Sequence, residues 1–104
     1  MAYSTSGTSL VNGFSISFTL PKGYYYLNMH FNYRSGVGNV TGNTTWTLRN
    51  ATPIYVNNGT GNYTCNALYQ GLIYSDGTAI RLSCTNDGNG ASYAFPYELV
   101  AYKM

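Results

Sequence analysis

His30 is the only imidazole in the chain, so it is the first residue to consider as a catalytic group. A catalytic histidine works with a nucleophile or a carboxylate, and no Asp or Glu lies near His30 in the sequence. The sequence therefore favours a histidine on the surface or at a subunit interface, and we expect no catalytic residue.

The three carboxylates of the chain are scattered as Asp76, Asp87 and Glu98. Asp87 lies in the run Asn86–Gly90, which is similar to a calcium loop, but such a loop supplies several carboxylates and this run has one. A turn built from Asn, Asp and Gly explains it better. Asp76 and Glu98 are too isolated to propose as the acid pair of a glycosidase. We expect no enzyme activity, no metal and no cofactor.

Cys65 and Cys84 are the only cysteines and could form one disulfide. Both lie in runs of alternating residues that are typical of strands, which favours two buried free thiols over a disulfide. Two cysteines and one histidine are too few ligands for a structural zinc site.

Tyrosine is the residue type that stands out, with 12 copies beside 4 phenylalanines. Its ring is large and its hydroxyl remains polar, so it suits protein interfaces and sugar-binding surfaces. The alternative is an exposed row of aromatic side chains that only stabilises cross-strand pairs. We take as candidate subunit or ligand contacts Tyr24, Tyr26, His30, Trp46 and Tyr97.

Composition limits the partners and the fold class of this chain. Charged residues make up only 8% of its 104 residues and the net charge is +2, with no cluster of cations that could follow a phosphate backbone. No apolar run approaches the length of a membrane span. We therefore expect neither nucleic acid nor membrane as a partner, and a single domain over residues 1–104.

Alternation of apolar and polar residues is the main structural signal, and it predicts about eight strands with no helix. The expected strands are Phe14–Leu20, Tyr24–Tyr33, Thr44–Arg49, Pro53–Val56, Tyr63–Tyr69, Gly71–Tyr74, Ile80–Cys84 and Ser92–Lys103. The proline places the Pro53–Val56 strand at a sheet edge. Asp76 and Gly77 accept the positive φ angles of a tight hairpin turn between two of these strands.

These strands predict an all-β fold, an antiparallel β-sandwich or jelly roll. The inward positions of the alternation define the expected core. Its members are Phe14, Ile16, Phe18, Leu27, Met29, Phe31, Trp46, Ile80, Leu82, Phe95 and Leu99.

Three stretches resemble the tumour-necrosis-factor-like jelly roll that is shared with complement globular heads. Gly23–His30 is similar to that family's Gly-x-Tyr-x-Phe strand. Ile73–Leu82 is similar to its Leu-x-x-Gly-Asp-x-Val-x-Leu hairpin, with Gly and Asp transposed, and Phe95–Tyr102 is similar to its closing strand. The chain also resembles small bacteriophage surface proteins of this fold, namely capsid decoration proteins and tail-fibre heads. The resemblance implies a homotrimer.

Two functions from different classes follow from this resemblance. The first is a homotrimeric capsid decoration protein, which is assembled in the host cytoplasm, lies on the virion surface and binds the major capsid protein or another virion protein. The second is the receptor-binding head of a tail fibre or baseplate, which holds host saccharide in a shallow aromatic site. We expect the first if the 104 residues are the whole protein, and the second if they are part of a longer chain.

Overall fold

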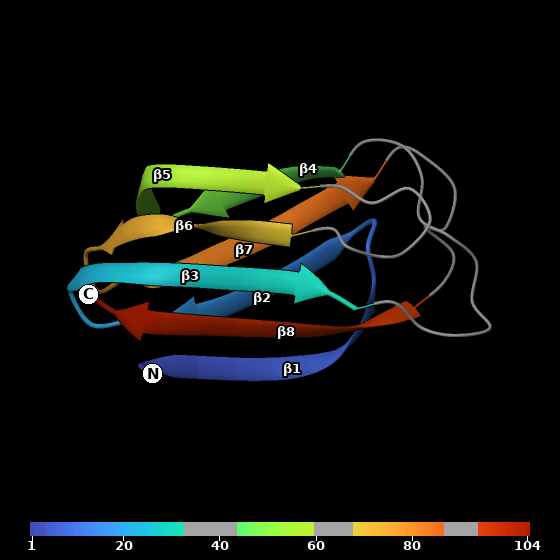
Figure 1. The fold of residues 1–104 in the computed structure, drawn as a ribbon. Coiled ribbons are helices and arrows are strands. Elements are labelled where there is room, and N and C mark those ends of the chain that lie inside the picture. The colour runs from blue at the N-terminus through green and yellow to red at the C-terminus, as the bar shows by residue number, and fades with distance from the viewer. Residues whose placement is uncertain (33–43, 60–67, 87–93) are drawn as a thin grey trace.

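The computed structural model describes residues 1–32, 44–59, 68–86 and 94–104, and it forms a sandwich of two antiparallel sheets (Figure 1). The strands are β1 (Tyr3–Leu10), β2 (Phe14–Thr19), β3 (Gly23–Phe31), β4 (Thr44–Arg49), β5 (Ala51–Gly59), β6 (Leu68–Ser75), β7 (Ala79–Asn86) and β8 (Ala94–Lys103). The described residues include no helix. The predicted all-β sandwich of eight strands is confirmed.

The strand order is β1-β8-β3-β6-β5 in the larger sheet and β2-β7-β4 in the smaller one. The pairs β1–β8, β2–β7 and β3–β6 are nested along the chain. Nesting of this kind brings distant parts of the sequence side by side, and the first and last strands are neighbours (Figure 1). Membership of the tumour-necrosis-factor-like family and the trimeric state remain predictions.

Strand β1 was not expected from the sequence. Its residues are mostly Ser, Thr and Gly, without an apolar alternation, and most of its side chains are exposed. It lies at the edge of the larger sheet and pairs in continuous register with β8, from Tyr3–Ala101 to Leu10–Ala94. An edge strand that buries little has no need of an apolar face, so the pattern that signals a strand is missing.

The Asp76–Gly77 turn differs from the predicted hairpin. Gly77 has a positive φ of 96°, as the sequence suggests. The strands on either side of it, β6 and β7, lie in different sheets and do not pair with each other. The turn therefore carries the chain from one sheet to the other, because local turn chemistry determines a change of direction and not the partner of the next strand.

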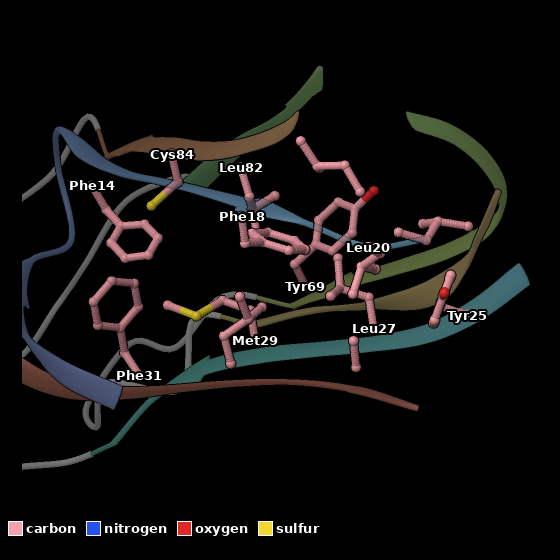
Figure 2. Close-up of a cluster of buried hydrophobic side chains, with 14 of the residues drawn as sticks. Phe14, Phe18, Leu20, Tyr25, Leu27, Met29, Phe31, Tyr69, Leu82 and Cys84 are labelled. Atoms are coloured by element: carbon pink, nitrogen blue, oxygen red, sulfur yellow. The ribbon is translucent and has the colours of Figure 1, made fainter. Parts of the chain in front are cut away.

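The core lies between the two sheets and is built from the inward residues of both (Figure 2). The predicted core members are fully buried except Ile16 and Trp46, which are partly buried and pack against the cluster. Both belong to edge strands of the smaller sheet, where one flank has no strand to cover it. The ring of Phe14 meets that of Phe31 edge-on across the sandwich, with centroids 5.3 Å apart (Figure 2).

Several predictions fall partly or wholly outside the described residues, including most of the predicted strand Tyr63–Tyr69. Cys84 is buried, and its thiol donates a hydrogen bond to the carbonyl oxygen of Val11 (3.0 Å), but Cys65 is not among the described residues. The preference for two free thiols therefore stays a prediction. Asp87, the carboxylate of the calcium-like run, also lies outside the described ranges.

Candidate functional site

The outward face of β3 carries three of the five predicted contact residues. Tyr25, Leu27, Met29 and Phe31 point into the core, so the intervening residues point away from it. Tyr24, Tyr26 and His30 consequently lie together on the outer face of the five-stranded sheet, as the alternation predicts.

Strand register adds aromatic neighbours that come from other parts of the chain. Tyr26 lies opposite Tyr102 of β8 on one side and Leu72 of β6 on the other. The rings of Tyr26 and Tyr102 are stacked with centroids 6.4 Å apart. Tyr24 lies opposite Tyr74, and their ring centroids are 5.0 Å apart.

A β-bulge brings a further tyrosine to the same face. The register of β5 against β6 shifts between Pro53 and Tyr55, which leaves Ile54 as the extra residue. Without this shift Tyr55 would have the same orientation as Pro53, whose cross-strand partner Ile73 is buried in the core. With the shift, Tyr55 pairs with Leu72 on the outer face.

Gly71 is what allows β5 to approach β6 so closely at the bulge. A Cβ atom at Gly71 would collide with the carbonyl oxygen of Tyr55 and would lie 3.0 Å from the Cα of Val56. A glycine inside a strand often marks such a close approach of another backbone. The sequence pattern predicts one strand that ends at Tyr69 and another that begins at Gly71, whereas in the structure β6 runs continuously through Gly71.

We call the resulting surface the tyrosine face. It consists of Tyr24, Tyr26, Tyr55, Leu72, Tyr74 and Tyr102. Tyr24 is 57% exposed, Tyr55 67% and Tyr102 43%, so large apolar surfaces meet solvent here. Aromatic residues gathered on an exposed face are typical of a binding surface.

Trp46 and Tyr97 are placed elsewhere. Tyr97 points inward from β8 and packs edge-on against Phe14, with ring centroids 4.9 Å apart. Trp46 points inward from β4 and its ring centroid lies 5.8 Å from that of Tyr69, a residue whose pKa is raised by burial. The structure therefore does not bring these two predicted contact residues to the tyrosine face.

His30 has a carboxylate neighbour that the sequence did not reveal. Glu98 of β8 lies directly opposite His30 on the outer face. Asp76, by contrast, follows Ser75, which pairs with Gly23 at the other end of β3. The seven-residue offset between Gly23 and His30 along β3 separates Asp76 and Glu98 by about 23 Å. That distance is far beyond the span of a glycosidase acid pair.

Two hollows lie on or beside the tyrosine face. One has a volume of about 260 Å³ and is lined by Asn50, Ala51, Thr52, Tyr74 and Asp76. The other has a volume of about 220 Å³ and is lined by Tyr26, Tyr55, Gln70, Gly71 and Leu72. Both lie along the β5–β6 pair, so polar and aromatic groups converge there.

Asp76 is the charged group of the first hollow. Its Oδ1 atom accepts hydrogen bonds from the hydroxyl of Thr78 (2.6 Å) and from the backbone N–H of Thr78 (3.0 Å). These bonds, the hydroxyl's first, hold the pKa of Asp76 below its ordinary value. The carboxylate is therefore negatively charged at neutral pH.

The part of the chain that the structure describes contains no group of three or more His, Cys, Asp or Glu side chains that could hold a metal ion. Within those same ranges, no helix has the length and apolar character needed to cross a bilayer.

Four members of the tyrosine face were not predicted from the sequence, namely Tyr55, Leu72, Tyr74 and Tyr102. Three of them are tyrosines, the residue type that stands out in the composition. What was missing was the register between strands and the bulge in β5, and neither leaves a local signal in the sequence.

No protein-family model and no curated protein sequence matches this chain. Among solved structures, the chain is similar to the tripod (BppUct-A-L) from the baseplate of bacteriophage Tuc2009, with a TM-score of 0.45 and 16% identity. The match covers 98% of this chain and 64% of the solved one, so the chain spans less than two thirds of the protein that it matches. A likeness at this level supports neither a family nor a function for the chain.

Proposed function

We propose that this chain is a non-enzymatic surface protein of a bacteriophage virion, a homotrimer that stabilises the shell as a capsid decoration protein. The tyrosine face is the observation that carries the binding role. Binding at such a face draws on many aromatic and backbone contacts and needs no reacting group. The trimeric state and the virion come from the resemblance of the whole chain, with its closing strand that ends in Val100–Lys103, to small bacteriophage surface proteins.

Subunits would meet through the exposed tyrosines of β3 and β8. Tyr24 and Tyr102 are both substantially exposed, and burying them against a second subunit removes apolar surface from water. On the outer face of β8, Glu98 is the one charged residue, and it lies several residues from Tyr102 along the strand. The low charge of this face of β8 lowers the desolvation cost of association through Tyr102.

The first experiment measures the oligomeric state by light scattering at micromolar concentration. We expect a trimer for the natural chain and a folded monomer for the double variant Tyr24→Thr, Tyr102→Thr. Leu10→Thr is the matched control. Leu10 is 42% exposed and Tyr102 is 43% exposed, but Leu10 lies at the opposite end of the sheet. A monomeric natural chain, or a trimer that survives the double substitution, would overturn the self-association.

The second experiment removes the protein from the virion. Particles that lack a decoration protein should assemble and adsorb normally but lose resistance to heat or low salt, since a ligand that binds only the assembled shell has been withdrawn. A second candidate, the receptor-binding head, is favoured by the two hollows beside the tyrosine face. It forecasts unchanged heat resistance with lost adsorption to host cells.

A further inference from the structure

The hollow lined by Asn50, Thr52, Tyr74 and Asp76 has a chemistry that points to one class of ligand. It lies where β4 passes into β5 and where β6 turns toward β7, at the end of the sandwich that also holds both chain termini (Figure 1). Thr52 and Tyr74, two of the residues that line it, are cross-strand partners on the outer face.

One wall of the hollow is aromatic. The Tyr74 ring is half-buried and is tilted by 58° against the ring of Tyr24. Contact with Tyr24 restrains the Tyr74 side chain, so its ring face can receive a flat apolar surface without losing much conformational freedom.

The other walls are polar and are held in place. The Asn50 side-chain amide donates a hydrogen bond from Nδ2 to the carbonyl oxygen of Ala79 (3.0 Å), which fixes the orientation of the carboxamide. The Asp76 carboxylate is fixed by its two hydrogen bonds from Thr78. Thr52 contributes an exposed hydroxyl that can donate and accept.

The five residues that line this hollow include no cation, and Asp76 gives it a negative charge that nearby Lys22 offsets only in part. An anionic ligand is therefore disfavoured beside the Asp76 carboxylate. A neutral pyranose fits each wall, because its C–H face is apolar and its adjacent hydroxyls donate to carboxylate and amide oxygens. The volume of about 260 Å³ is just below the range for drug-sized ligands, which suits a single sugar unit.

We propose that this hollow binds one neutral pyranose unit of a surface saccharide. The hollow around Tyr26, Tyr55 and Gln70 takes the next unit of the same saccharide. Tyr74 and Leu72 are two positions apart on β6, so the two sites follow each other along the strand at a spacing of about 7 Å. The inference deepens the receptor-binding candidate and rests on it, and it requires nothing of the decoration role.

The test is a titration of the isolated full chain with methyl pyranosides, followed by two-dimensional NMR. Each neutral sugar is paired with its uronate, which has the same ring but a carboxylate in place of the C6 hydroxymethyl group. We expect at least one neutral sugar to bind with a Kd of about 1 mM and its uronate to bind roughly tenfold or more weakly.

Variants connect the binding to the hollow. Thr52→Val removes one hydroxyl with little change of shape and should weaken binding of the neutral sugar roughly fivefold. Thr47→Val, at a threonine of β4 that is also exposed, should leave the binding unchanged. Asp76→Asn should narrow the difference between neutral sugar and uronate, because it removes the charge that repels the anion. Tyr74→Ala should abolish binding, and Thr52→Val serves if the Tyr74 variant does not fold.

Three results would overturn the inference: no saturable binding of any neutral pyranoside, equal binding of sugar and uronate, or equal binding by the natural chain and Thr52→Val. The outcome is separate from that of the proposed function. If the natural chain is a monomer that binds sugar, the proposed trimer is wrong and the sugar site stands. If it is a trimer that binds no sugar, the sugar site is wrong and the trimer stands.

Discussion

The two sheets of the sandwich present outer faces of opposite character. The outer positions of β2, β4 and β7 hold small hydroxyl residues, one alanine and two arginines. These residues are Ser15, Ser17, Thr19, Thr45, Thr47, Arg49, Ala79, Arg81, Ser83 and Thr85. The outer face of the five-stranded sheet instead carries five tyrosines and Leu72 in one cluster.

This contrast indicates which outer face is suited to solvent and which to a partner. Both sheets bury the same kind of apolar inner face, so stability does not require aromatic residues on either outer face. The serines and threonines on the outer face of the smaller sheet expose little apolar area to solvent. The tyrosines at the outer positions of the larger sheet expose apolar area, which is expected where a partner or ligand covers them.

The largest expected effect separates the inner and outer sides of β3. Phe31→Ala removes a fully buried ring and should lower the free energy of unfolding by about 3–5 kcal/mol. Tyr24→Thr, on the outer side of the same strand, should change it by about 0.5 kcal/mol or less in the monomer. Urea unfolding of the dissociated monomer measures both. A loss of similar size for Tyr24→Thr would mean that the tyrosine face serves stability.

An intermediate effect is expected at Gly71. Gly71→Ala places a methyl group against the backbone of β5 and should cost about 1–3 kcal/mol, because β5 must move away from β6. The same movement disturbs the bulge that holds Tyr55 on the outer face. Thermal unfolding measures the cost, and Tyr55 ring resonances report the displacement. A fully stable variant with unchanged Tyr55 resonances would contradict the role given to this glycine.

The smallest effect belongs to the smaller sheet. Arg49 and Arg81 lie directly opposite each other on its outer face, and like charges in this position are destabilising. Arg49→Thr should raise the free energy of unfolding by about 0.2–1 kcal/mol at low salt. The gain should shrink in about 1 M salt, where the Debye length falls to about 3 Å. A gain that is independent of salt would show that strand propensity and not charge is responsible.

Much of the fold was predictable because alternation is a local property. Phe14, Phe18, Leu27 and Met29 were assigned to the core correctly from their spacing alone, since a strand with one buried face repeats every two residues. The same signal placed Tyr24, Tyr26 and His30 on one outer face. It could not detect β1, whose edge position requires no apolar face.

Alternation alone established which side of each apolar strand faces the core, and composition predicted tyrosine as the main aromatic type available to a binding surface. Only the tertiary structure decided which tyrosines meet, that Glu98 faces His30, and that β6 and β7 separate at the Asp76–Gly77 turn. The physical reason is that every half-buried strand has the same two-residue period, so the period cannot name a partner. Partner and register are set by contacts between residues far apart in the chain, such as Tyr26 with Tyr102.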